Sequence, residues 1–276
     1  MWDKSLIKIH RTKTECFEGA MKVATFNCNS VRKRLPIILE WLEKEKPDLL
    51  ALQETKVQDK DFPAAAFHEA GYHVYYRGIK SWHGVATLTR EEPTEVLYGL
   101  DSSDNSDEYR LIQTVIKGVR IINTYVPQGT DVETEKFQYK LKWFARLRKY
   151  FDKYLKKGDP IIWLGDLNCA PEEIDVAHPE RVVNDPDFHI DARIAYKKTV
   201  EGRFIDVYRM KYPKKIQYTF WDFFRNAYAH NRGWRIDHIL ATPDLAKKCT
   251  KVVVDLEPRE KPNPSDHTFV WAKFKL

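Results

Sequence analysis

The chain has 276 residues, of which 43% are hydrophobic and 31% are charged, and this balance excludes broad disorder. No apolar run reaches the ~18–20 residues of a membrane span, and a net charge of +6 favours nucleic acid as a partner only slightly. The cysteines at 16, 28, 169 and 249 form no CxxC pair, so we expect reduced thiols in a cytosolic protein.

The first 20 residues, MWDKSLIKIHRTKTECFEGA, scatter single apolar residues among charges, which is unlike a signal peptide or an anchor. We expect a loose tail over residues 1–20, with a functional arm as the alternative. Residues 21–276 contain no repeat, low-complexity stretch or Gly/Ser linker, so they are predicted to form a single domain.

The N-terminal third predicts a strand, a helix and a second strand. An apolar run over residues 23–26 predicts a strand that ends at Asn27. Pro36 is suited to the first turn of the following helix, and that helix should stop before Pro47. A buried strand over 48–52 then leads to Gln53 and Glu54.

The rest of the chain continues to alternate strands with helices. Strands are predicted over 72–76, 85–89, 111–116 and 120–125. Apolar residues at helical spacing from Phe137 to Leu155 then predict one long amphipathic helix. Later strands are expected over 161–164, 218–221, 235–241, 252–255 and 268–274. Several β segments flanked by helices predict an α/β fold with two packed sheets covered by helices.

Five short polar clusters stand at predicted strand ends or strand starts. They are TFNCN at 25–29, LQETK at 52–56, LGDLN at 164–168, RIDH at 235–238 and SDH at 265–267. One such cluster would usually be a turn or a cap. Together they supply carboxylates, amides and a histidine, a set that suits phosphoryl chemistry on Mg²⁺. Zinc-ligand spacing and a GxxxxGK[ST] loop are both missing from the sequence.

The ordered motifs NxN, LQETK, YVPQG, GDLNxAPEEID, YTFW, GWRIDHIL and SDH resemble the exonuclease III branch of the endonuclease/exonuclease/phosphatase superfamily over residues 21–276. The resemblance implies a four-layer α/β/β/α sandwich with the active site at one end of the paired sheets. It also implies a DNA repair enzyme that cuts DNA 5′ to abasic sites, with 3′-to-5′ exonuclease and 3′-phosphodiesterase activity.

The same resemblance implies the surroundings of the enzyme. Its cofactor is Mg²⁺, with Mn²⁺ as a substitute, and its partner is double-stranded DNA that contains abasic sites or blocked 3′ ends. We expect a monomer without membrane contact. Its expected location is the cytoplasm, at the nucleoid in a prokaryote, or the nucleus in a eukaryote.

Residues of the metal end can be named from the matching motifs. Glu54 in LQET resembles the principal Mg²⁺ ligand, and Asn27 resembles the amide that supports the metal end. Asp266, next to His267, is expected to approach the metal. Asn29 stands where many relatives carry Asp, so we place it with the substrate-binding residues.

The catalytic residues follow in the same way. Asp166 resembles the carboxylate that orients and deprotonates the attacking water, and Asn168 resembles a donor to the scissile phosphate. His267 and Tyr125 resemble phosphate contacts, while Asp237 resembles the carboxylate that holds the histidine ring. Whether Asp166 or His267 is the base stays open.

A third group is expected to bind the rest of the substrate. Arg110, like Lys56, is predicted near a strand end, where it could line a DNA groove or remain a solvated surface charge. Phe220 and Trp234 match positions that wall the pocket for a flipped-out, base-less sugar, and core packing is their alternative.

Two other functions stay open. The first is another hydrolase of the superfamily, such as a non-specific nuclease, an inositol-phosphate phosphatase or a sphingomyelinase, which should lack the YTFW and GWRID segments. The second is a non-catalytic DNA-binding module on the same fold. That reading predicts decay of at least one catalytic position, and the sequence shows none apart from the tolerated Asn29.

Overall fold

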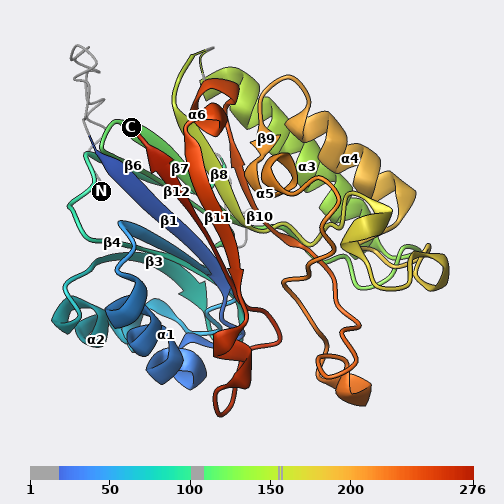
Figure 1. The fold of residues 1–276 in the computed structure, drawn as a ribbon, viewed down its shortest axis with the longest axis horizontal. Helices are drawn as coiled ribbons and strands as arrows, with labels where there is room; N and C mark the ends of the chain where they lie inside the picture. The colour runs from blue at the N-terminus through green and yellow to red at the C-terminus, as the bar shows by residue number, and fades with distance from the viewer. Residues whose placement is uncertain (1–18, 101–108, 155, 157) are drawn as a thin grey trace, which may run out of the picture.

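The computed structural model describes residues 19–100, 109–154, 156 and 158–276 (Figure 1). Most of the expected tail over residues 1–20 therefore lies outside the described residues, as does Leu155. The two ends of the described chain meet, because the backbone N–H of Leu276 donates to the carbonyl of Gly19 at 2.8 Å.

The first sheet has six strands in the order β11-β12-β1-β2-β4-β3. These strands are β11 (Cys249–Asp255), β12 (Phe269–Lys275), β1 (Ala20–Asn27), β2 (Leu49–Gln53), β4 (Trp82–Thr89) and β3 (His73–Ile79). Only β1 and β2 run parallel; the other neighbours are antiparallel. This mixed pairing brings the ends of β1 and β2 to the same edge as the start of β12.

The second sheet repeats this plan in the order β5-β6-β7-β8-β10-β9. Its strands are β5 (Glu95–Tyr98), β6 (Leu111–Ile116), β7 (Val119–Tyr125), β8 (Ile161–Asp166), β10 (Asp237–Ala241) and β9 (Ile205–Asp206). The central pair β7 and β8 is parallel, while β10 returns antiparallel to β8 with Asp237 opposite Asp166. The end of β8 and the start of β10 are therefore adjacent.

Helices cover the outer face of each sheet, so the chain forms the predicted four layers (Figure 1). The α-helices are α1 (Val31–Glu45), α2 (Ala64–Glu69), α3 (Glu135–Tyr154), α4 (Ile190–Val200), α5 (Val207–Lys211) and α6 (Pro243–Lys247). Short 3₁₀ turns are η1 (Asp59–Asp61), η3 (Glu173–Asp175), η4 (Pro179–Arg181), η5 (Phe224–Asn226) and η6 (Glu257–Glu260). Within the described residues, none of the helices is long and apolar enough to cross a membrane.

Strand alternation explains how one sequence fills three apolar layers. Val23 faces the core between the sheets, whereas Ala24 and Phe26 face the layer under α1. In the second sheet, Leu164 joins the core between the sheets and Trp163 packs under α3 and α4. Both faces of the central strands are therefore buried, which is why they read as continuous apolar runs.

Three expectations about local structure were wrong. Helix α1 begins at Val31, because the Thr55 carbonyl accepts from its N–H, so Pro36 lies in the second turn. Residues 218–221 form no strand: Phe220 makes isolated bridges, and the N–H groups of Thr219 and Phe220 both reach the Trp234 carbonyl, at 2.8 and 2.9 Å. The strand expected over 235–241 begins at Asp237.

Candidate active site

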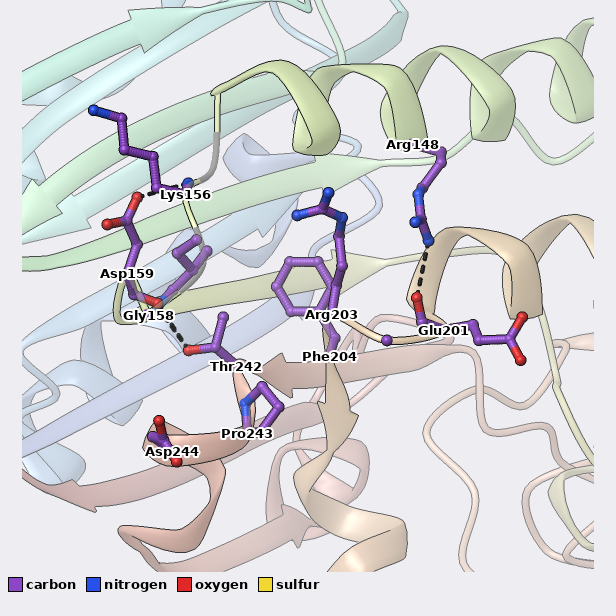
Figure 2. A pocket seen from close by; sticks show the side chains of 12 residues that line it. Arg148, Lys156, Gly158, Asp159, Glu201, Arg203, Phe204, Thr242, Pro243 and Asp244 are labelled. Atoms are coloured by element: carbon purple, nitrogen blue, oxygen red, sulfur yellow. Dashed lines mark hydrogen bonds between the residues drawn. The ribbon is translucent and has the colours of Figure 1, made fainter.

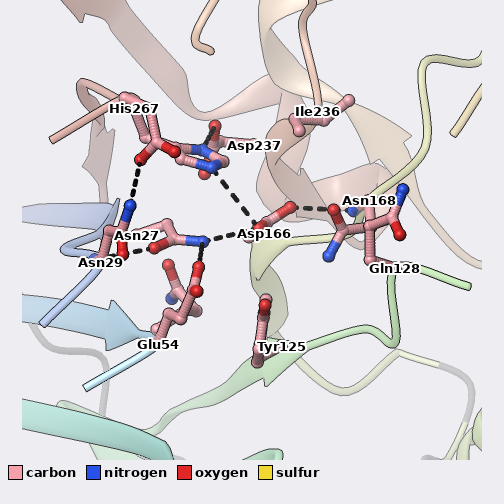
Figure 3. A network of polar contacts seen from close by, with 12 residues as sticks. Asn27, Asn29, Glu54, Tyr125, Gln128, Asp166, Asn168, Ile236, Asp237 and His267 are labelled. Carbon is pink, nitrogen blue, oxygen red and sulfur yellow. Dashed lines mark hydrogen bonds and ion pairs between the residues drawn. The ribbon is translucent and has the colours of Figure 1, made fainter. Parts of the chain in front are cut away.

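Side chains from both sheets meet at one end of the sandwich (Figure 3). Asn27 ends β1, Tyr125 ends β7 and Asp166 ends β8, while Asp237 begins β10. His267 lies two residues before β12, which runs antiparallel to β1. Parallel strands end at the same edge and antiparallel strands begin there, so the topology gathers polar groups that are far apart in sequence.

Asn27 joins the two sheets through its amide. Its Nδ2 donates to Glu54 Oε2 at 2.9 Å and to Asp166 Oδ2 at 2.8 Å, and the residue is only 1% exposed. Glu54 follows β2 in a left-handed conformation, with φ of 55°, which turns it toward Asn27. One buried amide therefore holds two carboxylates of opposite sheets in a single site.

The ammonium of Lys56 lies beside Glu54 and Asn29. Lys56 Nζ lies 2.7 Å from Glu54 Oε1 and donates to Asn29 Oδ1 at 2.6 Å. Asn29 Nδ2 in turn donates to Asp266 Oδ1 at 3.0 Å. Burial would raise the pKa of Asp266, but the His267 charge and the bonds from Asn29 and Ser265 outweigh it and lower that pKa. A set of carboxylate and amide oxygens of this kind fits a hard divalent cation.

A second group of possible ligands lies beside it. Among the described residues, Asp166, Asp237 and His267 each offer one ligand atom, and these atoms lie within 4.8 Å of one another. His267 Nδ1 already donates to Asp237 Oδ2 at 2.8 Å, and its Nε2 lies 3.9 Å from Asp166 Oδ2. A protonated imidazole repels a cation, so this group suits proton handling better than metal ligation.

Burial and mutual charge set the protonation of this group. Burial raises the pKa of Asp166 to about 8, helped by the Asp237 carboxylate and opposed by His267. Burial lowers the pKa of an imidazole, but Asp237 and Asp166 outweigh it and raise the pKa of His267 to about 10. Between these two values, a carboxylate at 166 faces an imidazolium at 267.

Local backbone geometry fixes the direction of Asp166 and Asn168. Gly165 has a φ of 141°, and a Cβ there would stand 1.9 Å from the Thr124 carbonyl oxygen, so no larger residue fits. Asp166 Oδ1 accepts from the backbone N–H of Asn168 at 2.9 Å. Asn168, with a φ of 43°, donates from Nδ2 to the Val126 carbonyl at 2.8 Å.

Tyr125 and Arg110 form the opposite wall. Burial, with Glu54 and Asp166 nearby, holds the pKa of Tyr125 well above its ordinary value, so the ring keeps its phenolic proton. The Arg110 guanidinium lies 4.9 Å from the centre of the Tyr125 ring and contacts His83 at 2.8 Å. Arg110 is only 5% exposed, so the alternative of a solvated surface charge was wrong. The Arg110 guanidinium therefore helps to fix the position of the Tyr125 ring through a cation–π contact.

Aromatic residues lie beside His267. The centre of the Phe220 ring is 4.8 Å from that of His267, and Phe220 pairs with Trp234 through an isolated bridge. Both rings pack against a small apolar cluster that includes Ile236 while staying partly buried. The structure therefore brings the expected pocket residues next to the polar end of the site.

Several residues of this region were missed by sequence reasoning. Gln128 lies in Figure 3 beside Asn168, and its Nε2 donates to Asp187 Oδ2 at 3.4 Å. Asp187 pairs with Lys140, whose ammonium is fully buried. The signal for Lys140 was its spacing, because a residue three positions after Phe137 lies on the apolar face of α3.

A separate cavity of about 390 Å³ lies at the opposite end of the second sheet, where β8 begins and β10 ends (Figure 2). Its lining includes both signs of charge, from Arg148, Asp159, Arg203 and Asp244. Such a lining does not select a ligand of one charge.

Comparison with known proteins agrees with the geometry. Residues 24–267 match the model of the endonuclease/exonuclease/phosphatase family. Exodeoxyribonuclease III of Haemophilus influenzae is 33% identical, over 92% of this chain and 100% of that protein. An AP endonuclease from Archaeoglobus fulgidus superposes with a TM-score of 0.90 at 48% identity, over 93% of this chain and 100% of that chain.

The 3′ phosphatase NExo from Neisseria, bound to a product DNA hairpin, gives a TM-score of 0.89 at 34% identity, with the same coverage of 93% and 100%. The family match over residues 24–267 includes the strand ends that contribute to the site, from Asn27 to His267. The chain therefore belongs to the endonuclease/exonuclease/phosphatase family.

Proposed function

We propose that this protein is a Mg²⁺-dependent DNA repair phosphodiesterase that incises DNA 5′ to abasic sites. We include 3′-to-5′ exonuclease and 3′-phosphodiesterase activity in the proposal. The observation that supports it most is the Asn27 amide, which joins Glu54 to Asp166 beside the His267–Asp237 pair. The names of the relatives, an exodeoxyribonuclease III, an AP endonuclease and a 3′ phosphatase, support the same reaction class.

Asp166 and His267 have different roles in the proposed reaction. Asp166, as a carboxylate, orients a water molecule and accepts its proton while the water attacks phosphorus in line. His267, as an imidazolium, faces the charge that develops on the phosphate oxygens. The P–O3′ bond breaks, leaving a 3′-hydroxyl and a 5′-deoxyribose phosphate. Between about pH 8 and pH 10 the imidazole is protonated while Asp166 is a carboxylate, and this favours Asp166 as the base.

The remaining donors hold the substrate. Tyr125 keeps its phenolic proton and Asn168 has a second amide hydrogen, so both can donate to the scissile phosphate. Glu54 would bind Mg²⁺, with Asn27 and Asp266 beside it, and the ion would neutralise charge on the phosphate oxygens. Lys56 would leave Glu54 Oε1 for a phosphate when the ion binds.

Specificity is proposed to come from Phe220 and Trp234. An abasic sugar lacks a base, so it can turn out of the duplex without losing a base pair of its own. A normal nucleotide costs a few kcal/mol to unstack, and its base would then meet the two rings. The pocket beside His267 therefore favours damaged sites.

A labelled duplex with one tetrahydrofuran site tests the proposal against the same duplex without damage. Incision 5′ to the tetrahydrofuran is expected with Mg²⁺ and none with EDTA, and the Asp166→Asn variant should incise ~10²–10⁴-fold more slowly. Equal cutting of both duplexes would contradict the specificity, and cutting in EDTA would contradict the metal.

The proposal extends to the whole chain. We infer that residues 21–276 act as one catalytic domain and that the enzyme works as a monomer in the compartment that holds the DNA. Size-exclusion chromatography with light scattering at assay concentration measures the state, and a dimer would contradict it.

A further inference from the structure

Lys140 of α3 is a fully buried lysine close to the active site. Its Nζ donates to the Gln128 carbonyl at 3.0 Å, to the Pro186 carbonyl at 2.8 Å and to the Asn168 carbonyl. It also pairs with Asp187 Oδ1 at 2.7 Å. The side chain of Lys140 is 0% exposed, so its ammonium is shielded from water.

The four acceptors belong to three separate segments. Gln128 lies in the connection after β7, Asn168 follows β8, and residues 186 and 187 precede α4. Asp187 adds two further ties, because its carbonyl accepts from Ala170 N–H at 2.7 Å and its Oδ2 accepts from Gln128 at 3.4 Å. One ammonium therefore joins the loops that border the Asp166 side of the site.

Asn168 is the acceptor whose conformation most requires such a hydrogen bond to hold it. It is held in the left-handed region, with φ of 43°, a conformation that side chains rarely adopt. Its backbone N–H is the group that orients Asp166 Oδ1, at 2.9 Å. Lys140 donates a hydrogen bond to the carbonyl of this same residue, so it influences the orientation of both Asn168 and Asp166.

Packing alone does not explain a lysine here. The neighbouring positions on this face of α3, Phe137 and Phe144, are buried and apolar. Replacing a buried ion pair by apolar residues of similar volume often leaves stability unchanged or improves it. An ammonium, however, offers three donors that can reach three chain segments at once, which no apolar side chain can do.

We propose that Lys140 is a positioning residue of the active site, with Asp187 as its counter-charge. It holds the loops after β7 and β8 so that Asn168 and Asp166 point at the scissile phosphate. The inference rests on the proposed function, since it concerns the same site. It adds a residue that touches neither substrate nor metal.

The test separates positioning from folding with three variants. Lys140→Met leaves Asp187 as an uncompensated buried charge. Lys140→Met/Asp187→Asn removes that charge while keeping an amide to bond with Gln128. Leu147→Ala is the control, because Leu147 lies two turns further along the same buried face of α3 and its apolar side chain can make no hydrogen bond to Asn168 or Asp187.

Each variant is measured for melting temperature, for DNA affinity in EDTA and for single-turnover incision of abasic DNA. In Lys140→Met the melting temperature should fall and the rate should drop about 10²-fold, with affinity within about threefold. The double variant should regain most of the melting temperature and none of the rate. Leu147→Ala should lose melting temperature while its folded fraction keeps the normal rate.

Recovery of the rate together with the melting temperature in the double variant would overturn the proposal. Equal slowing by Leu147→Ala would do the same. A second readout needs no substrate: the ¹⁵N side-chain amide signal of Asn168 should move in both Lys140 variants and stay in place in Leu147→Ala. If the wild-type protein fails to cut abasic DNA, the proposed function fails, and this signal still decides the positioning role.

Discussion

Asp237→Asn should shift the pH dependence of incision more than it alters the fold. The carboxylate holds the His267 Nδ1 proton at 2.8 Å, and its charge is the largest influence that raises the pKa of His267. An amide keeps the hydrogen bond and removes the charge. Among the described residues, Asp237 Oδ1 has no hydrogen-bond partner, so the new amide nitrogen replaces no existing contact.

The structure sets the size of the effect. The wild-type rate should rise as Asp166 loses its proton near pH 8 and fall as His267 loses its own near pH 10. Without the Asp237 charge, the pKa of His267 should fall, because burial lowers it while Asp166 and Asp266 still raise it. At pH 9, the protonated fraction should then drop about tenfold for each unit by which the pKa falls below 9, with a matching loss of rate. At pH 6.5 a larger fraction of His267 stays protonated, so the loss should be smaller there.

Single-turnover incision of a tetrahydrofuran duplex between pH 6 and 10 measures this shift. In Asp237→Asn the descending limb should move to lower pH, because the pKa of His267 falls. The double variant with His267→Gln should be about as slow as His267→Gln alone. Equal slowing of Asp237→Asn at every pH, or penalties that multiply in the double variant, would refute the coupling.

The other predictions use the same duplex. Glu54→Ala should need far more Mg²⁺ and recover partly as Mg²⁺ rises; a loss that no Mg²⁺ relieves would remove its ligand role. Asp166→Asn should slow single-turnover incision ~10²–10⁴-fold with DNA affinity intact, and near-normal turnover would sink the base assignment. Phe220→Ala and Trp234→Ala, once shown to be folded, should lower the ratio of abasic to undamaged cleavage, whereas equal losses would make both rings core residues. A chain that starts at Gly19, which keeps the bond to the C-terminus, should melt and cut as the full chain does; a large drop in either would give residues 1–18 a structural role.

Local patterns in the sequence were enough to predict most strands and the groups at their ends. The strand over 111–116 was predicted with its observed bounds, and Asp166 was placed at the end of a buried strand. Such strands are recognisable because both of their faces are buried, so an apolar run stops abruptly where the chain leaves the sheet. The four-layer arrangement came from the resemblance, and the structure confirms it.

Contacts between distant segments were decided only by the tertiary structure. The amide of Asn27 meets Asp166 across 139 positions, and no local pattern encodes that pairing. Residues 218–221 have the composition of a strand, yet the N–H groups of Thr219 and Phe220 both donate to the Trp234 carbonyl, and Phe220 pairs with Trp234 in an isolated bridge rather than in a continuous strand. The burial of Arg110 and Lys140 likewise depends on which loops close over them. Apolar periodicity is a property of neighbours along the chain, whereas the partners of a buried charge are supplied by whatever the fold places beside it.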